Sequence, residues 1–425
     1  MLLLFNYYNA MQLKKIFIAF ILVSTVLSGI ACMRQGKNTS HNNSNQNNTP
    51  IATQASTGES TPSVTTDPVS TNSTSSTQAS SKDEGDQHLP PNWPWRGICL
   101  ESKSTHPDDI DYLASIHVNF VRLQLKPSRR TMRDGGDPTK NFYKEIAWAD
   151  SMLDKLKQHG MTSVLAFNFL VLDPKNDVDD KSSEFWKKPT YIDSTYKMVD
   201  IIARHFQSRG DELSCYEIIG EPALKGKGNA EIPSQIETFY QEVLKTIRKS
   251  DTRRWFLLTP GPWGRPTNYK DFKPYRIKDD KLIYGAHMYL PDAFTHQGVK
   301  NREKGMRYPG QIKNEFYDKS TIERKFKAIA DFKKQYNYPI YIGEFQAARW
   351  SDGADIWVRD VLETIDDNGW GWSYFAFEAG QDFWDPYYDV ANPKQSSEEW
   401  KIEYKGPQTK IWQYMISEYA KNKKK

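Results

Sequence analysis

Eight short apolar segments recur between residues 93 and 375, and stretches whose apolar residues have helical spacing separate them. Helical spacing is clearest over residues 146–156 and 236–247, and Ser320 with Glu323 predicts a capped helix start. No glycine-rich phosphate turn follows a segment, which disfavours a doubly wound sheet. The alternation therefore predicts an α/β fold, a (β/α)8 TIM barrel. The predicted strands are Gly97–Leu100, Val118–Leu123, Val164–Phe169, Leu213–Ile219, Trp255–Leu258, Ile283–Met288, Pro339–Ile342 and Gly371–Phe375.

The first 32 residues have the order of an export signal. Two lysines precede an apolar run, Ile16–Leu27, and small residues then lead to Cys32. This run is shorter than the roughly 18 residues that a membrane span needs. Cys32 directly follows Ala31, which predicts a lipidated cysteine, although Gly29-Ile30-Ala31 also fits ordinary secretion. We therefore predict secretion or lipid anchoring at the bacterial cell envelope, with membrane attachment only through Cys32.

Residues 33–90 differ in amino-acid composition from the rest of the chain. They contain no aromatic residue, and Ser, Thr, Asn and Gln fill 27 of the 40 positions from His41 to Ser80. Such a composition cannot bury enough apolar surface to offset the entropy of ordering the chain. We predict a disordered linker over residues 33–90 and one folded barrel domain over residues 91–425.

Charge and cysteine content exclude several classes of protein. The formal net charge is only +4, so no basic surface for nucleic acid is indicated. Cys32, Cys99 and Cys215 have neither zinc-ligand nor CxxC spacing. Cys99 and Cys215 fall in strands that are not neighbours in such a barrel, which predicts buried free thiols. No cluster of His and Asp lies at the predicted strand ends, which disfavours a metal-dependent hydrolase. We predict a monomer with no metal and no organic cofactor.

Polar residues collect at the carboxyl ends of the predicted strands, where a barrel of this type places its chemistry. Glu221 follows the fourth strand and Glu344 follows the seventh. Two carboxylates facing each other across a barrel mouth are what a retaining glycosidase needs, because one protonates the leaving oxygen while the other attacks the sugar carbon. The other polar or aromatic residues at these ends are Arg122, Asn168, Trp263, His287, Tyr289, Trp372 and Phe375.

Six short motifs follow one another along residues 93–419. They are Val121-Arg122-Leu123, Gly220-Glu221-Pro222, His287-Met288-Tyr289, Tyr308-Pro309-Gly310, Gly343-Glu344-Phe345 and Gly369-Trp370-Gly371-Trp372. In these motifs and their order the chain resembles glycoside hydrolase family 5, the cellulase-like retaining enzymes. The resemblance implies an endo-acting hydrolase of a β-linked polysaccharide, either a cellulose-like β-glucan or a mannan. It also implies that Glu221 is the general acid/base and Glu344 the nucleophile.

The same resemblance gives roles to the residues around the two carboxylates. Arg122 resembles the arginine that holds the nucleophile ionised, because a nearby cation favours a charged carboxylate. His287 and Tyr289 resemble the pair that forms hydrogen bonds around the nucleophile and the sugar ring oxygen. The negative charge of Glu344 is then expected to keep Glu221 protonated for its first proton transfer.

Aromatic residues near the strand ends are expected to stack on sugar faces, because a pyranose presents C–H groups to a ring. Phe375 is expected at the sugar platform of the family, with Trp372 as the alternative. Aromatic residues make up 13% of the chain, which also favours a planar, amphipathic ligand. The stacking candidates in the loops are Trp263, Trp350, Trp384 and Trp186.

Two positions depart from the family. Gly220 stands where the family has an asparagine that binds the sugar 2-hydroxyl, and Asn168 stands where the third strand usually brings a histidine. Asn168 could compensate for the missing amide, the sugar could differ at its 2-position, or turnover could be slow. The alternative function is therefore a surface protein that binds glycan on the same barrel with little or no catalysis. The sequence does not separate cellulose, mannan, xylan and mixed-linkage glucan as substrates.

Overall fold

The computed structural model describes residues 89–168, 183–224, 232–299, 302–377, 385–390, 402–404 and 406–424. All of them lie in one of the two units into which the chain divides, Ser81–Lys425. The predicted signal segment, residues 1–32 with Cys32, and residues 33–88 of the predicted linker lie outside the described residues, so both remain predictions. Within the described ranges, no helix combines the length and the apolar character that crossing a membrane requires.

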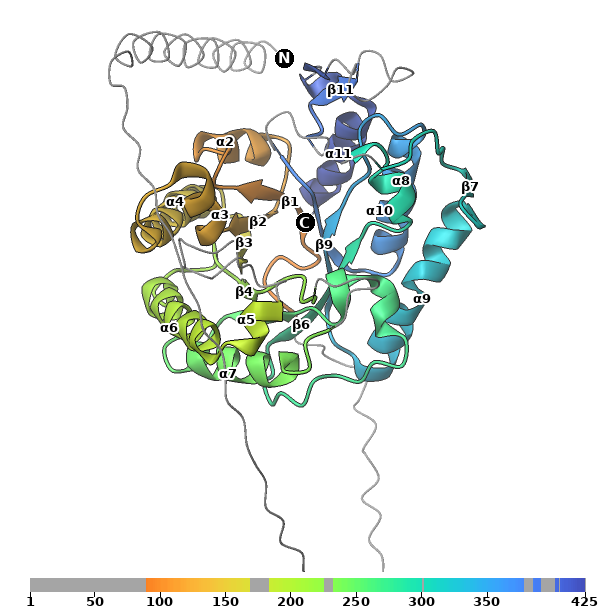
Figure 1. Cartoon of the computed structure of the whole chain (residues 1–425). Coiled ribbons are helices and arrows are strands. Elements are labelled where there is room, and N and C mark those ends of the chain that lie inside the picture. Colours follow the sequence, from red (N-terminus) through yellow and green to blue (C-terminus); the bar gives the residue numbers. More distant parts are fainter. Residues whose placement is uncertain are drawn as a thin grey trace, which may run out of the picture. The chain divides into compact units, whose positions relative to one another are not determined.

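Eight parallel strands close into a barrel (Figure 1). Their order around the barrel is β1-β10-β9-β6-β5-β4-β3-β2, so that β1 pairs with both β2 and β10. The predicted (β/α)8 TIM barrel is confirmed. The barrel strands are β1 (Arg96–Glu101), β2 (Phe120–Leu125), β3 (Thr162–Phe167), β4 (Cys215–Ile218), β5 (Trp255–Leu258), β6 (Leu282–Met288), β9 (Ile340–Phe345) and β10 (Gly371–Tyr374).

Each of the eight predicted strands corresponds to one barrel strand, with its ends displaced by three residues or fewer. Two hairpins were not predicted, because strands of three residues carry too little alternation to be recognised. One hairpin pairs β7 (Gly310–Ile312) with β8 (Glu315–Tyr317), and the other pairs β11 (Tyr388–Val390) with β12 (Ile402–Tyr404).

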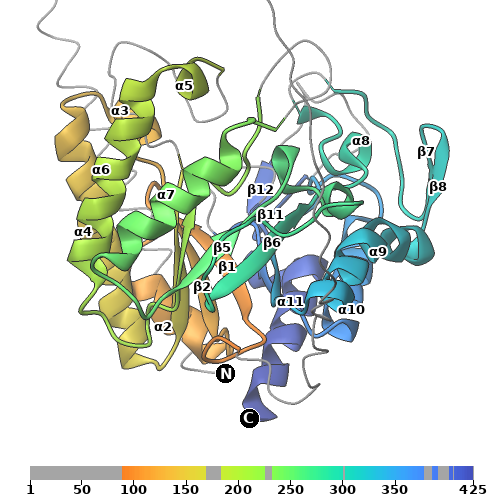
Figure 2. The ribbon, with the colours of Figure 1, turned by 90° about the horizontal axis from the view of Figure 1, so that it is seen from below.

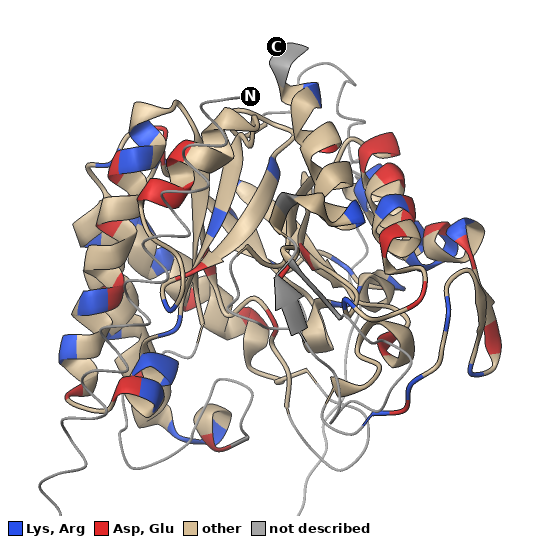
Figure 3. Ribbon diagram, turned by 90° about the horizontal axis from the view of Figure 1, so that it is seen from above, with Lys and Arg blue, Asp and Glu red and all other residues tan. Residues whose placement is uncertain are grey.

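Helices cover the outside of the barrel (Figures 1 and 2). Their outer faces carry basic and acidic residues side by side (Figure 3). The α-helices are α2 (Asp108–Ser115), α3 (Pro127–Asp134), α4 (Pro138–Gln158), α5 (Ser183–Lys187), α6 (Pro189–Phe206), α7 (Ile236–Arg248), α8 (Asp292–Thr295), α9 (Lys319–Tyr336), α10 (Ala354–Asp367) and α11 (Lys410–Tyr419). The short 3-10 turns are η2 (Pro262–Gly264), η3 (Pro266–Tyr269), η6 (Gly406–Gln408) and η7 (Ala420–Lys424).

Both stretches with predicted helical spacing are helices, α4 and α7, and they bury the apolar residues that were expected to face the core. The predicted capping box of Ser320 and Glu323 is wrong. Helix α9 begins one residue before Ser320, and Asp318 is its cap, with a carboxylate oxygen 2.9 Å from the backbone nitrogen of Thr321. Asp318 is as good a cap as serine, so local sequence did not distinguish the two starts.

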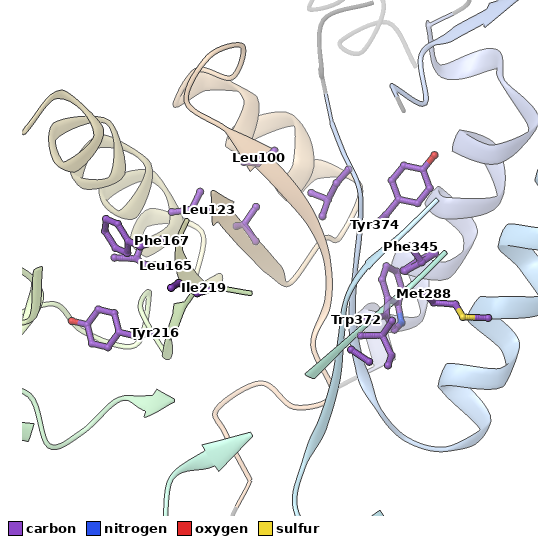
Figure 4. Packing of buried hydrophobic residues seen from close by; sticks show 14 of the residues in the cluster. Leu100, Leu123, Leu165, Phe167, Tyr216, Ile219, Met288, Phe345, Trp372 and Tyr374 are labelled. Atoms are coloured by element: carbon purple, nitrogen blue, oxygen red, sulfur yellow. The ribbon is translucent and has the colours of Figure 1, made fainter. Parts of the chain in front are cut away.

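Alternation along the strands separates an outer core from the barrel interior. On β2, Val121, Leu123 and Leu125 pack with the surrounding helices, whereas Phe120 belongs to the cluster inside the barrel. Figure 4 shows Leu123 in the outer core with Leu165 and Phe167 of β3. Because successive side chains of a strand point to opposite faces, Arg122 and Gln124 share the inner face with Phe120. The interior is therefore apolar at the start of the strand and polar at its carboxyl end.

Cys99 and Cys215 are free and buried, which confirms the prediction for both thiols. Burial raises the pKa of Cys99 to about 12, although neighbouring Arg122 acts in the opposite direction. The thiol is therefore protonated at neutral pH and lies 3.4 Å from the carbonyl oxygen of Gly343. It packs beneath the site described below without acting as a nucleophile.

Candidate active site

A pocket of about 410 Å³ brings together strand ends and loops from β4, β5, β6, β9 and β10. It lies at the carboxyl ends of the strands, the position at which such barrels place their active sites. The sequence-predicted residues Glu221, Trp263, His287, Tyr289, Glu344 and Phe375 all line it. The described residues that line it are Glu221, Trp263, Arg265, His287, Tyr289, Asp292, His296, Arg302, Glu344 and Phe375.

Glu344 points into the barrel because strand β9 is irregular at this point. Ile342 pairs with Ala286 of β6, but the next pair joins Glu344 to His287, which leaves Gly343 as an extra residue. A bulge of this kind shifts the alternation of side chains by one residue. Without it, Glu344 would share the outer face of β9 with Ile342 instead of reaching the pocket.

Three side chains hold the carboxylate of Glu344 by donating hydrogen bonds to it. Arg122 Nη1 and Gln124 Nε2 lie 2.7 and 2.9 Å from Oε1, and the Tyr289 hydroxyl lies 3.1 Å from Oε2. Burial and then the charge of Glu344 raise the pKa of Tyr289 well above its usual value. The phenol therefore stays protonated and can donate its hydrogen bond to Glu344. The carboxylate is thus fixed in an orientation suited to attack.

Arg122 is fully buried and spans two carboxylates. Its Nε lies 2.7 Å from Oε2 of Glu217, while its Nη1 binds Glu344. Arg122 is buried, so it contacts Glu344 from beneath the pocket, as expected for the arginine that favours a charged carboxylate, and it is not placed to touch a substrate. It positions Glu344 and neutralises charge beneath the pocket.

Glu221 reaches the pocket through a sharp reorientation of the chain after β4. Ile219 has φ of 61°, a left-handed conformation that is rare for a β-branched residue. Tyr240 holds this turn by donating a hydrogen bond of 3.0 Å to the carbonyl oxygen of Ile219. Glu221 then emerges half-buried, with Oε1 2.9 Å from Nδ1 of His287.

His287 is almost completely buried between the two glutamates. Burial alone would lower its pKa, but the carboxylates of Glu344 and Glu221 outweigh burial and raise it. The ring therefore holds a proton more readily than a free histidine, and its Nδ1 forms a hydrogen bond with Oε1 of Glu221. One carboxyl oxygen of Glu221 is fixed in this way.

Oxygens of Glu221 and Glu344 and a ring nitrogen of His287 lie within 4.8 Å of one another. A separation of about 5 Å between two carboxyl groups is typical of retaining glycosidases. Three such atoms could also hold a metal ion, a cluster that was not expected from the sequence. Arg122, at 2.7 Å from Glu344, places a permanent positive charge beside that position, so the arrangement favours acid–base and nucleophilic chemistry over cation binding.

Gly220 lies directly above Glu217. A side chain starting at Gly220 would put its Cβ 2.2 Å from Oε1 of Glu217 and 3.0 Å from Nη2 of Arg122. Glu217 thus fills the space that the family's asparagine would need, and its Oε1 is buried without a hydrogen-bond partner. Asn168 accepts a hydrogen bond of 2.9 Å from the backbone N–H of Gly220 and is absent from the described lining of the pocket. This amide oxygen supports the turn, so compensation by Asn168 at the sugar is not supported.

The aromatic predictions divide into two groups. Phe375 and Trp263 line the pocket, as expected for rings that stack on sugars. Trp372 is fully buried in the outer core beside Phe345 (Figure 4), and its ring lies 5.5 Å from that of Tyr419, so its predicted contact with substrate is corrected. Phe375, its alternative, is the pocket residue.

Trp350 and Trp186 are not among the described residues that line the pocket. Trp350 donates from its indole nitrogen to the carbonyl oxygen of Gln297 at 2.7 Å and is absent from the described lining, so its stacking on sugar stays a prediction. Trp186 packs in the core against Phe239, with ring centroids 5.3 Å apart. Trp384 lies outside the described residues. Tryptophan therefore serves the core of this barrel more often than its pocket.

Five residues at the site were not predicted from the sequence. Gln124 follows Arg122 on the same face of β2, a period-two signal that could have found it. Of the other four, Arg265 and Arg302 lie in loops, and Asp292 and His296 lie at the two ends of the four-residue helix α8, which is too short to show a periodicity. His296 has its pKa lowered to about 4 by burial and then by the charge of Arg302, so it is neutral at pH 7.

The fold is shared with solved glycoside hydrolase structures. A structure titled as a glycoside hydrolase has a TM-score of 0.56 at 15% identity, covering 77% of this chain and 99% of the other. Endoglucanase Cel5A of Thermotoga maritima has a TM-score of 0.54 at 19% identity, covering 69% of this chain and 92% of the other. At such identities the likeness establishes the fold alone.

Sequence comparison adds relatives and a family. Endoglucanase C of Acetivibrio thermocellus is 26% identical over 163 residues, 31% of this chain and 47% of that protein. Endoglucanase 3 of Fibrobacter succinogenes is 32% identical over 113 residues, 26% of this chain and 16% of that protein. The chain thus spans about half or less of the curated relatives it matches. The family model for cellulase, glycosyl hydrolase family 5, matches residues 82–381. Most of the chain is covered by that match, and the protein belongs to glycoside hydrolase family 5.

Proposed function

We propose that the protein is a retaining, endo-acting hydrolase of a β-linked glucan, with Glu344 as nucleophile and Glu221 as general acid/base. The observation that carries this proposal is the meeting of Glu221, His287 and Glu344 within 4.8 Å at the carboxyl ends of β4, β6 and β9. Each glutamate has its own set of partners, so the two groups can perform different tasks.

In the first step, the Glu344 carboxylate attacks the anomeric carbon while Glu221 transfers a proton to the leaving glycosidic oxygen. Arg122, Gln124 and Tyr289 hold the attacking carboxylate in place. The products are a glycosyl ester on Glu344 and a released sugar chain. His287 keeps the carboxyl group of Glu221 oriented toward the leaving oxygen through the bond to its Oε1.

In the second step, Glu221 is a carboxylate and takes a proton from water, whose oxygen attacks the anomeric carbon. The bond to Glu344 breaks, and its carboxylate returns to the same three donors. Two inversions at one carbon leave the product with the β-configuration of the substrate. Neither step needs a metal or an organic cofactor.

The endoglucanase names of the sequence relatives support a β-glucan as the substrate. Mannan is the second candidate, because one solved structure of similar fold, Thermotoga maritima Cel5A, is described in complex with mannotriose as well as with cellobiose. Gly220 offers no side chain to the sugar 2-position, where glucose and mannose differ. The glycine is therefore compatible with either sugar.

The test is product release by the purified full chain from β-glucans, mannans, xylans and aryl glycosides. We expect cleavage of one polymer, loss of at least about 1,000-fold in kcat for Glu344→Gln, and no loss for Glu242→Gln, a matched change on the exposed face of α7. Glu221→Ala should recover turnover of an activated aryl glycoside with azide and form a β-glycosyl azide. An α-glycosyl azide, or full activity of Glu344→Gln, would contradict the proposed roles.

Gly220 favours a second candidate, a glycan-binding protein with little or no turnover, because the hydrogen bond that the family's asparagine gives to the 2-hydroxyl is absent. Tight binding of one polymer by the full chain, without product release, would support this candidate. Hydrolysis at a rate that Glu344→Gln abolishes would exclude it.

For location, we propose lipid anchoring or secretion at the cell envelope, based on the sequence around Cys32. Expression of the full chain in a bacterium with Cys32→Ala should move the protein from the membrane fraction to the soluble exported fraction. An unchanged membrane fraction would contradict attachment through Cys32.

We also propose that the protein acts as a monomer, which light scattering of the purified chain would test.

A further inference from the structure

A second pocket, of about 470 Å³, adjoins the catalytic pocket. The two pockets share Phe375, and Gln124, which binds the nucleophile, lines the second pocket as well. Its volume lies in the usual range for small-ligand sites, about 300–1,000 Å³. The described residues that line it are Glu101, Ser102, Lys103, Gln124, Lys126, Arg129, Arg130, Met132, Arg133, Glu145 and Phe375. We call it the basic pocket.

The basic pocket carries five cationic side chains against two carboxylates. Three of the five come from helix α3, which begins immediately after β2 at the catalytic end of the barrel. The outer helices of the barrel, by contrast, mix both signs of charge (Figure 3). A concave surface with an excess of positive charge concentrates anions near it.

Both carboxylates are committed to internal contacts. Glu145 is almost completely buried and accepts hydrogen bonds from the Ser102 hydroxyl at 2.6 Å, from the backbone N–H of Lys126 at 3.0 Å, and from Arg130. These three contacts hold the start of α3 against α4. The negative charge of Glu145 therefore organises the wall of the pocket and is not presented to a ligand.

Glu101 behaves in the same way. Burial alone would raise its pKa, but Lys126 and Lys103 outweigh burial and lower the pKa to about 2. Lys126 forms an ion pair with Glu101 and also lies over the ring of Phe375, 5.8 Å from its centroid. Phe375, which the two pockets share, therefore has the positive charge of Lys126 beside its ring.

The exposed members of the pocket are Lys103, Arg129, Met132 and Arg133, three cations and one apolar side chain. Arg133 already donates from Nε and Nη2 to Asp134, which lies outside the lining, so it contributes charge while Arg129 contributes the guanidinium that the lining presents; the pocket keeps an excess of positive charge when Asp134 is counted. A guanidinium presents a planar pair of donors that matches a carboxylate or a phosphate. A ring of Phe375 beside such groups suits a sugar that carries an anionic substituent.

We infer that the basic pocket is a subsite for an acidic sugar, so that the substrate is a β-glycan bearing carboxylate or phosphate groups near the cleaved bond. This inference rests on the proposed function and adds a substrate class to it. The neutral backbone would occupy the catalytic pocket, and an anionic substituent a short distance along the chain would occupy the basic pocket.

The test compares cellopentaose with a series of cellopentaoses that each carry one C6 carboxylate on a different sugar, and with a matching C6-phosphate series. For at least one position, the wild-type full chain should show a kcat/KM about ten-fold higher than for the neutral oligomer. In 0.5 M NaCl this preference should shrink several-fold, because salt screens exposed charges. Equal values for all positions in both series overturn the inference while leaving the proposed function intact.

The matched variants are Arg129→Gln/Arg133→Gln in the pocket and Arg204→Gln/Lys327→Gln on α6 and α9. All four residues are exposed, and both pairs remove two positive charges. The pocket pair should reduce the ratio of acidic to neutral kcat/KM about ten-fold, and the control pair should leave that ratio unchanged. A ratio that falls equally in both pairs would assign the effect to net charge and overturn the inference.

Binding is read separately from turnover with Glu344→Gln and calorimetry. If no oligomer is hydrolysed by the wild type, the proposed function fails, and calorimetry still decides the inference by the preference for acidic over neutral oligomers. Inorganic phosphate provides the remaining comparison. If it binds as tightly as the acidic oligomers and displaces them, the pocket is a site for free anions and the glycan assignment is overturned.

Discussion

At the scale of single residues, the proposed nucleophile Glu344 is held by a donor that lies outside the family motifs. Gln124 gives Glu344 a hydrogen bond of 2.9 Å beside the charged bond from Arg122. Arg122 and the two glutamates could be predicted from motifs, because their chemistry demands specific residue types. Gln124 could be found only from its place on the inner face of β2, since glutamine has no catalytic signature of its own.

We predict that Gln124→Met, which keeps the volume of the side chain, lowers kcat about ten-fold and changes KM little. A hydrogen bond to a charged group contributes about 1.5–3 kcal/mol, and its loss lets the Glu344 carboxylate rotate away from the attacking geometry. Steady-state kinetics on the cleaved polymer measure the effect. Gln311→Met on the exposed β7–β8 hairpin is the control, and an equal kcat for Gln124→Met would contradict the role.

The side chain of Glu217 occupies the space that a side chain at position 220 would need. Gly220→Ala should lower the free energy of unfolding by about 1–3 kcal/mol, because its Cβ would displace Oε1 of Glu217 and disturb the ion pair with Arg122. In a Glu217→Ala background the same change should cost almost nothing. Denaturant titrations of the four proteins in this cycle measure the coupling. Additive losses would show that the crowding does not act as described.

His287 links stability to pH. Its pKa is raised above 6.5 in the folded protein, so the protonated ring contributes stability that is full below about pH 6.5 and is lost as the pH rises through the folded value. The free energy of unfolding of the wild type, relative to His287→Gln, should therefore be largest at pH 5.5 and decline toward pH 9. A difference that stays constant or grows with pH would contradict a charged His287 between the glutamates.

At the scale of elements, the eight barrel strands could be predicted because each is a run of apolar residues bounded by helical spacing. The bulge at Gly343 and the left-handed turn at Ile219 could not, since neither has a signature in local composition. Each irregularity directs one of the two pocket glutamates, Glu344 or Glu221, into the pocket. The regular strands therefore form the scaffold, and two local departures from regularity form the site.

Gly343→Ala tests whether the close packing of Gly343 against the ring of His287 matters for catalysis. A Cβ at this position would lie 3.1 Å from Nε2 of His287 and 3.2 Å from Cε1 of Tyr341, closer than most such contacts. The ring of His287 must move by a few tenths of an ångström, which should lower kcat about ten-fold through its bond to Glu221. Circular dichroism should show an intact fold. Unchanged kcat would show that the position of His287 is not critical.

At the scale of the whole molecule, closure of the barrel joins the two ends of the described domain. Helix α11 packs on β1, where the Tyr419 hydroxyl donates a hydrogen bond of 3.0 Å to the carbonyl oxygen of Gly97. The ring of Tyr419 lies 5.5 Å from that of Trp372 on β10. One side chain near the C-terminus thus covers the seam between the first and last barrel strands, a long-range contact that no local pattern could have predicted.

We therefore predict a graded loss of stability at position 419 with little effect on catalysis. Tyr419→Phe removes only the hydrogen bond and should cost about 1 kcal/mol of unfolding free energy, whereas Tyr419→Ala also opens a cavity and should cost about 3–5 kcal/mol. Denaturant unfolding measures both values, and kcat measured well below the melting temperature should stay within two-fold of the wild type. Because a closed barrel cannot lose one seam and keep the rest, both variants should unfold in a single transition. A separate early transition in Tyr419→Ala would show that α11 detaches alone and that the seam is not coupled to the barrel.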